Sequence, residues 1–356
     1  MAGKLGIEHS VIGFYAFNNT GGVAEALYRA TLRWCDRLRC PPHIMGTSYD
    51  KKLISFKRSN SKLEKIGFSN VEYFQLVSLP PDAKHELEGD NFQIVADFKR
   101  QTLTISARTS IASLTKGSLL PLAQEAADIL QPEYGIGFHR DERFGPTFYV
   151  SGVGCFPASW KPPESEEEEE KMWAEIGGWG SYGLPNHVWQ HGFIRSVYPW
   201  NFLTSSQLQE KIDGLTLERW IRKSPDHGTL TGFTNNMTLW EVPTQDIPRL
   251  KTLLEEAKII FNARRYDDIY YEARDGQSAP PEEILRRLRD PNYVIEPDPC
   301  PPPPLSAEGV LRMVLGDTAA EEVRVLHVDK QGTEPAVQEL STEEVKRIQK
   351  KGNKPK

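Results

Sequence analysis

The sequence is poor in cysteine and contains no long apolar run. Its 356 residues include 4 cysteines, too few for a disulfide framework in a chain of this length. Cys35 and Cys40, in CDRLRC, do not have the spacing of a zinc-binding pair. No segment approaches the roughly 18 apolar residues that cross a bilayer, and the N-terminus lacks the pattern of a secretory signal. We therefore expect a reduced, cytoplasmic protein without a membrane partner.

An excess of basic charge is also absent. The chain carries 43 basic and 49 acidic residues, a net charge of −6, whereas a dedicated nucleic-acid binder usually has a basic excess on one domain. The tail Lys346–Lys356 (KRIQKKGNKPK) holds six basic side chains, so contact with nucleic acid is expected, if anywhere, only there. Hydrophobic residues make up 38% of the chain, enough for a packed core.

The motifs of several enzyme classes are missing. SGVGC (151–155) and GWGSYG (178–183) have the residue types of a nucleophile elbow but not its GxSxG pattern. The sequence has no GxxxxGK[ST] loop, and YGIGF supplies glycines without a complete GxGxxG after a strand. We therefore expect no cofactor, and a protein without enzymatic activity is favoured.

The first part of the chain alternates extended and helical patterns. The run VIGFYAF (11–17) is β-branched and aromatic, which is typical of a buried strand. Apolar residues at helical spacing predict one helix over 23–38 and another over 118–130. Further strands are expected at 71–79, 91–98 and 101–108. This mixture predicts an α+β protein with mixed sheets covered by helices.

Two changes of composition divide the chain. The segment PASWKPPESEEEEEK combines proline with six glutamates in seven residues, as solvated linkers do. Beyond residue 275 the composition changes to a charged helix and a proline-rich connector. The predicted parts are a first α+β domain (1–156), an acidic linker (157–171), a second α+β domain (172–275), the charged helix and connector (276–305), and a small helix and hairpin module with a basic tail (306–356).

Local patterns within the second domain are clear. The segment 229–242 (TLTGFTNNMTLWEV) predicts a hairpin that turns at Asn235–Asn236. A helix is expected after Thr244, assigned as its N-cap, because Leu250 and Leu254 share one helical face.

Five consecutive polar residues form the most enzyme-like stretch. Residues 134–154 read YGIGFHRDERFGPTFYVSGVG. His139, Asp141 and Glu142 could exchange protons, while Arg140 and Arg143 could hold an anion. Side chains alternate between the two faces of a strand, so at most three of the five can converge on one point. A charged hairpin tip is therefore favoured, with partner contact second and catalysis third.

Two histidines could in principle bind a metal. His187 and His191 are four residues apart, which places both rings on one face of a helix. A metalloprotease would have glutamate directly after the first histidine, where this chain has Val188, and no third ligand follows at a clear spacing. Histidines that form hydrogen bonds beside aromatic neighbours are the favoured interpretation.

Acidic and aromatic residues gather around the linker. Seven of the eight tryptophans lie between residues 160 and 240, and tryptophan, tyrosine and arginine side chains supply much of the energy at protein interfaces. The acidity of this surface favours a basic protein as the partner. The predicted partner-binding residues are Arg140, Arg143, Glu166, Glu167, Glu168, Trp173, Trp179 and Tyr182. The alternative is that the tryptophans pack the second domain against the first.

Parts of the sequence resemble bacterial proteins. RSVYPWNFL, GLTLERWI and HGTLTGF…LWEVPTQDIPRLKTLLEEA resemble uncharacterised bacterial proteins. The FYAF strand, the helix after it and the stretch YGIGF…GPTFYVSGV look like the layout of immunity proteins that neutralise bacterial toxins. The resemblance spans residues 11–260 and carries over no catalytic residue. It implies an intracellular protein-binding protein of immunity or defence-accessory type. The alternative is a hydrolase or transferase built on His139, Asp141 and Glu142.

Overall fold

The computed structural model describes the residue ranges that carry the sheet and its covering helices. These are 7–17, 22–50, 52–81, 90–142, 145–151, 186–262, 265–266, 269, 281–290 and 292–293. All of them belong to one compact unit, Met1–Ile295. The acidic linker 157–171 and the C-terminal module 306–356 lie outside the described residues.

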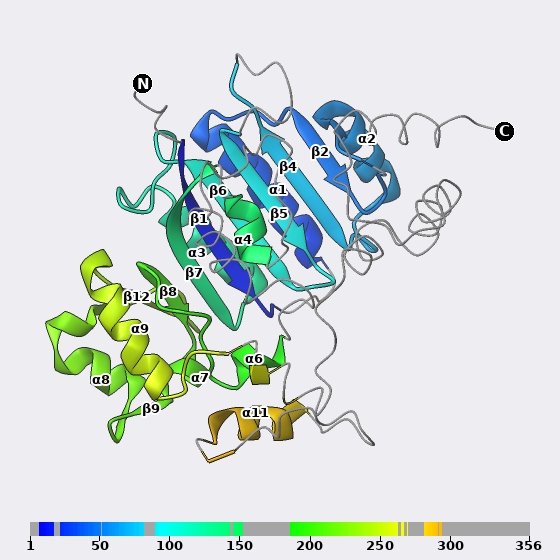
Figure 1. Ribbon diagram of the computed structural model, residues 1–356. Helices are drawn as coiled ribbons and strands as arrows, with labels where there is room; N and C mark the ends of the chain where they lie inside the picture. The colour runs from blue at the N-terminus through cyan, green and yellow to red at the C-terminus, as the bar shows by residue number, and fades with distance from the viewer. Residues whose placement is uncertain are drawn as a thin grey trace, which may run out of the picture. The chain divides into compact units, whose positions relative to one another are not determined.

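A ten-stranded sheet forms the centre of the described unit (Figure 1). Every pair of neighbouring strands in it is antiparallel. In spatial order the strands are β11 (Thr229–Gly232), β12 (Thr238–Glu241), β8 (Trp200–Leu203), β7 (Tyr134–Asp141), β1 (Glu8–Tyr15), β6 (Thr102–Arg108), β5 (Phe92–Asp97), β4 (Tyr73–Ser78), β2 (Ile44–Thr47) and β3 (Ile54–Ser55).

The α+β class is confirmed, but the strands of the two predicted domains share one sheet. Strand β7 from the first domain pairs with β8 from the second, with Tyr134 opposite Leu203 and Gly137 opposite Trp200. One antiparallel sheet therefore replaces the two mixed sheets expected. The sequence did not tell whether the two sections form one continuous sheet, and the structure shows that they do. The predicted domain boundary lies outside the described residues and stays a prediction.

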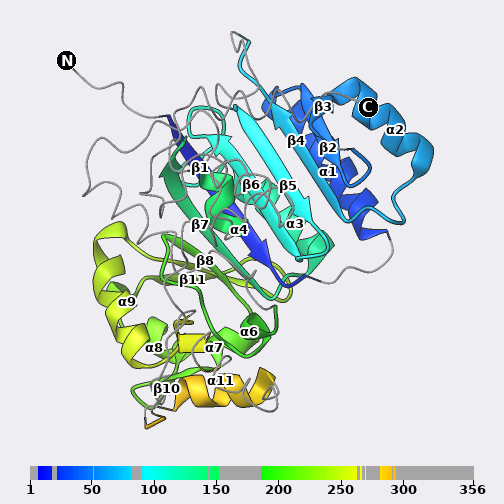
Figure 2. The ribbon, with the colours of Figure 1, turned by 45° about the vertical axis from the view of Figure 1, so that its right-hand side comes forward.

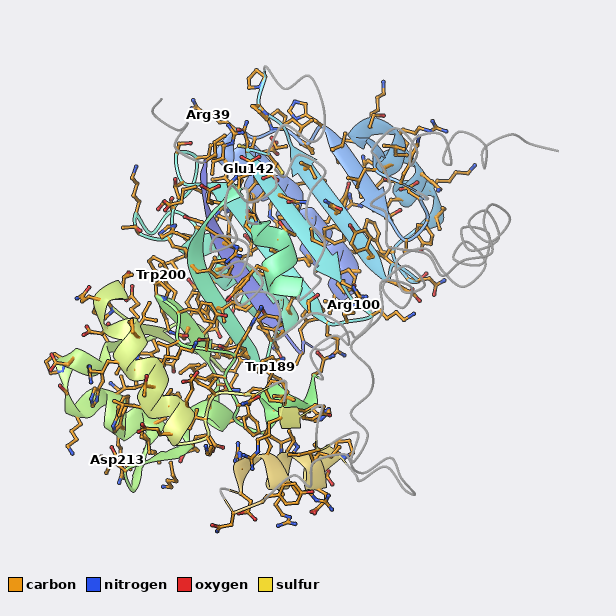
Figure 3. The ribbon with its side chains drawn as sticks, viewed as in Figure 1. Arg39, Arg100, Glu142, Trp189, Trp200 and Asp213 are labelled. Atoms are coloured by element: carbon orange, nitrogen blue, oxygen red, sulfur yellow. The ribbon has the colours of Figure 1, made fainter. Side chains whose placement is uncertain are left out.

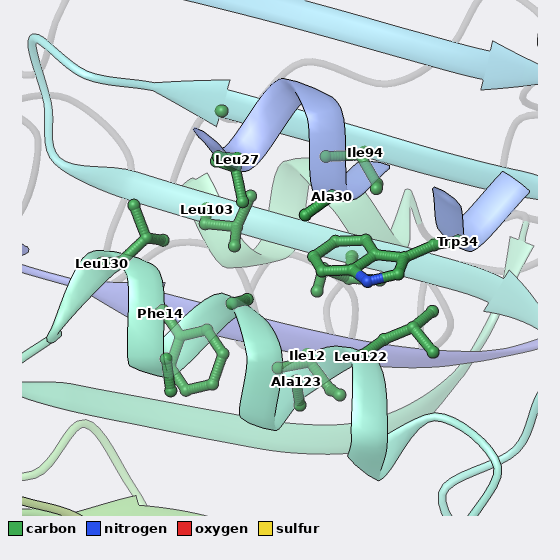
Figure 4. Packing of buried hydrophobic residues seen from close by; sticks show 14 of the residues in the cluster. Ile12, Phe14, Leu27, Ala30, Trp34, Ile94, Leu103, Leu122, Ala123 and Leu130 are labelled. Carbon is green, nitrogen blue, oxygen red and sulfur yellow. The ribbon is translucent and has the colours of Figure 1, made fainter. Parts of the chain in front are cut away.

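One face of the sheet is covered by α1 (Val23–Leu38) and α3 (Leu120–Leu130). Both predicted helices are thus confirmed, and α3 begins two residues later than expected. Figure 4 shows Trp34 and Leu27 of α1 packed over sheet residues such as Ile94. Small residues on the buried sides of the helices let them approach the strands closely. A further helix, α2 (Phe56–Ile66), lies beyond β2 near the edge of the sheet (Figures 1 and 2).

The opposite face carries the short helix α4 (Pro146–Ser151), visible in front of β1 and β6 in both views (Figures 1 and 2). Gly13 of β1 makes room for it, because a Cβ there would lie 2.6 Å from Val150 of α4. Val11 and Tyr15 belong to the core on this face, while Ile12 and Phe14 belong to the core on the other. An unbroken apolar run is what a strand buried on both faces requires.

The remaining described elements pack around the core that contains Val11 and Tyr15. It includes α6 (His187–Gln190), α7 (Ser205–Leu208), α8 (Leu217–Lys223), α9 (Ile247–Glu256), α11 (Pro281–Arg289) and the small pair β9 (Lys211–Ile212) and β10 (Leu215–Thr216). The predicted hairpin is confirmed as β11 and β12. Thr244 is not the N-cap of α9, because a 3-10 turn over Thr244–Asp246 comes first. The helix ends at Glu256, and Lys258 then adopts a φ of 58°.

Candidate functional site

The polar run His139–Glu142 lies at the end of a central strand, not at a hairpin tip. His139, Arg140 and Asp141 are the last residues of β7 and pair with Ser10, His9 and Glu8 of β1. The hairpin expectation was wrong for two reasons. Strand β1 extends to Glu8 and keeps β7 paired, and the segment after β7 forms α4 where a second strand was expected.

His139 lies on the face that α3 covers and makes internal contacts. Its Nδ1 shares a hydrogen bond of 3.0 Å with Ser10 Oγ, and its Nε2 shares one of 2.9 Å with Thr115 Oγ1. The imidazole also packs edge-on against Trp200, with 5.2 Å between the ring centroids. Burial lowers the pKa of His139. Because both ring nitrogens are hydrogen-bonded to hydroxyl groups of the protein, this histidine has a structural role.

Arg140 points to the opposite face, as strand alternation requires. Its guanidinium carbon lies 4.3 Å from the centre of the Tyr149 ring in α4, within the range of a cation–π contact. Asp141 follows on the same strand face as His139, opposite Glu8. Arg143 lies outside the described residues. The run is therefore divided between two environments on opposite sides of the sheet.

Glu142 meets two titratable residues that come from distant parts of the chain. Its Oε2 lies 3.9 Å from Nε2 of His9, and Oδ1 of Asp90 lies 3.8 Å from Nδ1 of the same imidazole. Nδ1 also shares a hydrogen bond of 3.0 Å with Ser106 Oγ in β6. We call His9, Asp90 and Glu142 the acid–imidazole cluster. Figure 3 shows Glu142 at one end of the central strands, far from Trp189 at the other.

The acid–imidazole cluster holds two carboxylates, and a guanidinium lies close to one of them: Nε of Arg108 donates to the backbone carbonyl oxygen of Asp90 at 2.9 Å. The imidazole of His9 is fully buried, while the side chains of Asp90 and Glu142 are 20% and 23% exposed. Burial raises the pKa of Asp90 to about 6; nearby His9 and Arg108 oppose this shift, whereas the charge of Glu142 adds to it. Among the described residues, neither carboxylate forms an ion pair with a lysine or an arginine.

Two buried polar atoms of the cluster have no hydrogen-bond partner. They are Nε2 of His9 and Oδ1 of Asp90. Buried polar atoms are nearly always hydrogen-bonded in folded proteins, so an exception calls for an explanation. The sequence pattern did not indicate this cluster, because His9 and Asp90 reach Glu142 only through the pairing of β1 with β6 and β7 and of β5 with β6. The one usable signal was that the strand VIGFYAF could extend backward through His9.

A buried arginine positions α4 beside this site. The guanidinium of Arg195 donates to Tyr15 Oη at 2.8 Å and to the backbone carbonyl oxygens of Val150 at 3.2 Å and Tyr149 at 2.7 Å. Burial acts to lower the pKa of Arg195, but the oxygens of Tyr15, Tyr198 and Tyr149 outweigh it and the pKa is raised. Arg195 thus ties α4 to β1 and holds Tyr149 in place under Arg140.

The other predicted site residues fall into two groups. His187 lies in α6, with its Nε2 3.5 Å from Tyr266 Oη, and burial lowers its pKa. Within the described ranges, His187 and His191 join no group of three or more ligands able to hold a metal ion. The partner-binding residues Glu166, Glu167, Glu168, Trp173, Trp179 and Tyr182 lie outside the described residues and remain predictions.

Most of the tryptophans that the structure describes are buried in the core. Trp189 and Trp240 are fully buried, and Trp220 is 3% exposed. Trp189 stacks on Tyr134 with 4.8 Å between the ring centroids. Trp200 is half-buried beside His139. Any tryptophan surface for a partner must therefore come from Trp160, Trp173 and Trp179, which lie outside the described residues.

Comparisons with known proteins assign the chain to no family. No protein-family model matches it, and no curated protein matches it. One solved structure, "Pseudomonas aeruginosa T6SS protein PA0821", resembles it with a TM-score of 0.44 and 14% sequence identity, over 81% of this chain and 83% of that one. A resemblance with so low a TM-score and sequence identity demonstrates neither a shared fold nor a shared function. No helix in the described ranges is both long and apolar enough to cross a membrane.

Proposed function

We propose that this chain is a non-catalytic, intracellular protein-binding protein of immunity (toxin-neutralising) or defence-accessory type. It binds its partner through acidic and aromatic surface. The observation that supports the proposal best is the acid–imidazole cluster, because Asp90 and Glu142 are partly exposed carboxylates that form no ion pair with a lysine or an arginine among the described residues. The six glutamates of the linker add acidity of the same sign.

A basic partner would gain from both features. Unneutralised carboxylates attract a basic surface over a distance and speed its association. Once the interface excludes water, a cation placed against them forms charge-assisted hydrogen bonds, which are stronger than neutral ones. Toxins that act on nucleic acid or on anionic surfaces carry basic patches for the same electrostatic reason. An acidic binder that covers such a patch would block the toxin.

The alternative function has less support from the geometry. A hydrolase or transferase built on His139, Asp141 and Glu142 needs these groups close together. His139 is bonded to Ser10 and Thr115 on one side of the sheet, whereas Glu142 lies beside His9 on the other. His9 with Glu142 offers an acid–base pair, but the imidazole is fully buried, which keeps a substrate from reaching it.

The test is affinity capture from the native host with the tagged full-length chain. We expect one protein to be recovered in equal amount, and to be released as the salt concentration rises because the contact is electrostatic. The recovered protein should stop the growth of a test bacterium when it is produced alone. Co-production of the present chain should restore growth. Recovery of no stoichiometric partner, or of one whose toxicity this chain leaves unchanged, would contradict the proposal.

A further inference from the structure

The most unusual group in the described structure is the imidazole of His9. It is fully buried, one ring nitrogen is bonded to Ser106, and the other has no hydrogen-bond partner. Carboxylates lie near both nitrogens, at 3.8 Å and 3.9 Å, distances too long for hydrogen bonds. Such an arrangement is costly in a free protein, since it concentrates negative charge and leaves buried polar atoms unpaired.

We propose that the acid–imidazole cluster is a receptor for one cationic side chain of the protein partner, with an arginine as the best fit. This inference rests on the proposed function and names the chemistry that the site recognises. The guanidinium has five N–H donors in a planar fork and no acceptor. It would donate to Glu142 Oε2 at the mouth of the site and lie in the combined field of Glu142 and Asp90.

The position of the two carboxylates supports a cation at this place. They come close enough for the charge of Glu142 to contribute to the raised pKa of Asp90. A cation between them removes that repulsion, so it gains from two negative charges at once. Both side chains keep about a fifth of their surface exposed, at 20% and 23%. Solvent therefore reaches the two carboxylates, whereas the imidazole is fully buried.

The receptor is built on rigid elements, which distinguishes it from a chance group of surface acids. His9 is in β1, Ser106 is in β6, and Glu142 directly follows β7, whose backbone pairs with β1. The N–H of Glu142 donates to the carbonyl oxygen of Ile7 at 2.8 Å. The N–H of Arg108 donates to the carbonyl oxygen of Asn91 at 3.0 Å and so anchors the segment beside Asp90. A preorganised site loses little entropy when it binds.

Binding to this receptor should depend on pH. The charged and titratable groups that face the imidazole are Asp90, Glu142, Arg108 of β6 and Arg140 of β7. Because the pKa of Asp90 is raised to about 6 by burial, mild acid removes one of the two negative charges. Loss of that charge weakens the attraction for a cation.

The first experiment titrates the full-length protein with Nα-acetyl-arginine amide and follows the carboxyl carbons and the histidine nitrogens by NMR. We expect shifts at Glu142, Asp90 and His9, and weaker binding at about pH 5 than at about pH 7.5. Nα-acetyl-citrulline amide, which has the same shape without the charge, should leave these signals in place. Equal shifts from both compounds would overturn the proposal.

Variants provide the matched controls. Glu142→Gln should weaken binding of the arginine amide about tenfold, since one charge-assisted hydrogen bond is lost. Glu72→Gln removes an exposed carboxylate outside the cluster and should leave binding unchanged. If Glu142→Gln binds the arginine amide as the parent protein does, the receptor is not at this place. The histidine signals of each variant also report whether the site has kept its fold.

Capture from the host separates this inference from the proposed function. If the parent protein recovers a partner and the double variant with Asp90→Asn and Glu142→Gln recovers it equally well, only the receptor is overturned. If the parent protein recovers no partner while it still binds the arginine amide, the proposed function fails instead. Loss of the partner in the double variant alone, with Glu72→Gln unaffected, supports both.

Discussion

Two histidines on neighbouring strands show how different the two faces of the sheet are. His139 of β7 lies opposite Ser10, and His9 of β1 lies opposite Arg140, one residue further along the ladder. His139 has a hydroxyl partner at each ring nitrogen. His9 has one hydroxyl partner, one unpaired nitrogen and two carboxylates nearby. On one face, both ring nitrogens of the histidine are hydrogen-bonded. On the other face, one ring nitrogen has no partner, so a ligand could supply the missing hydrogen bond.

The difference follows from what covers each face. Around His139 the chain supplies neutral groups, the hydroxyls of Ser10 and Thr115 and the ring of Trp200. Around His9 it supplies charged groups, the carboxylates of Asp90 and Glu142 and the guanidinium groups of Arg108 and Arg140, and the nearby covering element is the short helix α4. Structural histidines are usually satisfied within the fold, whereas strain and unpaired groups concentrate at functional sites. The comparison therefore favours His9 over His139 as the functional histidine.

The largest expected effect comes from removing the residue that holds α4 over the face of His9. Arg195→Met leaves the carbonyl oxygens of Tyr149 and Val150 without their guanidinium donor. We expect the free energy of unfolding to fall by about 4 kcal/mol, measured by urea denaturation. The control Arg222→Met removes an exposed arginine that pairs with Glu218, and should cost about 0.5 kcal/mol. Equal losses in both variants would show that α4 is not held by Arg195.

The next effect is the pH dependence of the free energy of unfolding, which we expect to arise from Asp90 beside His9. Burial raises the pKa of Asp90 to about 6 from the ordinary 3.8, so the folded state binds a proton that the unfolded state has released. The stabilisation is complete below about pH 4 and is lost as the pH rises through about 6. Asp90→Asn removes this loss and should raise stability at about pH 7.5 by about 2 kcal/mol.

The measurement is a set of urea denaturation curves from about pH 4 to about pH 7.5. The difference between parent and Asp90→Asn should grow over this range. The control Asp213→Asn changes an exposed residue in the turn between β9 and β10, and should stay within about 0.5 kcal/mol of the parent protein throughout. A pH-independent difference for Asp90→Asn would mean that its carboxyl is not the group that titrates.

Local patterns predicted the elements well, and alternation correctly divided the polar run between two faces. The helix over 23–38 and the hairpin over 229–242 were visible because their signals are short-range: apolar periodicity for the first, and turn residues between alternating strands for the second. The segment GPTFYVS was harder. Its aromatic and β-branched residues favour a strand, yet Pro146 and contact between Val150 and β1 make it helical.

The candidate site could not be predicted from sequence for a physical reason. His9, Asp90 and Glu142 lie in three segments separated by more than fifty residues each. They meet only because β6 and β7 pair with the two edges of β1 and β5 pairs with β6. Long-range pairing of this kind depends on the packing of the whole sheet, which a single sequence does not display. The run His139–Arg143 includes Glu142 and so indicated the correct end of β7. The residues that Glu142 meets there, His9 and Asp90, come from distant segments.

The smallest effect tests the comparison between the two histidines directly. Ser106→Ala removes the hydrogen bond of the His9 imidazole in a fully buried place, and should lower the free energy of unfolding by about 1 kcal/mol. Thr115→Val removes one of two bonds of His139 at an exposed position, where water replaces the lost hydroxyl, and should cost less than about 0.5 kcal/mol. Histidine nitrogen NMR should show an altered tautomer for His9 in the first variant and an unaltered Nδ1 for His139 in the second. If Thr115→Val proves the more damaging of the two, His139 depends more on its partners than His9 does, and the face of His139 must be considered again as the functional one.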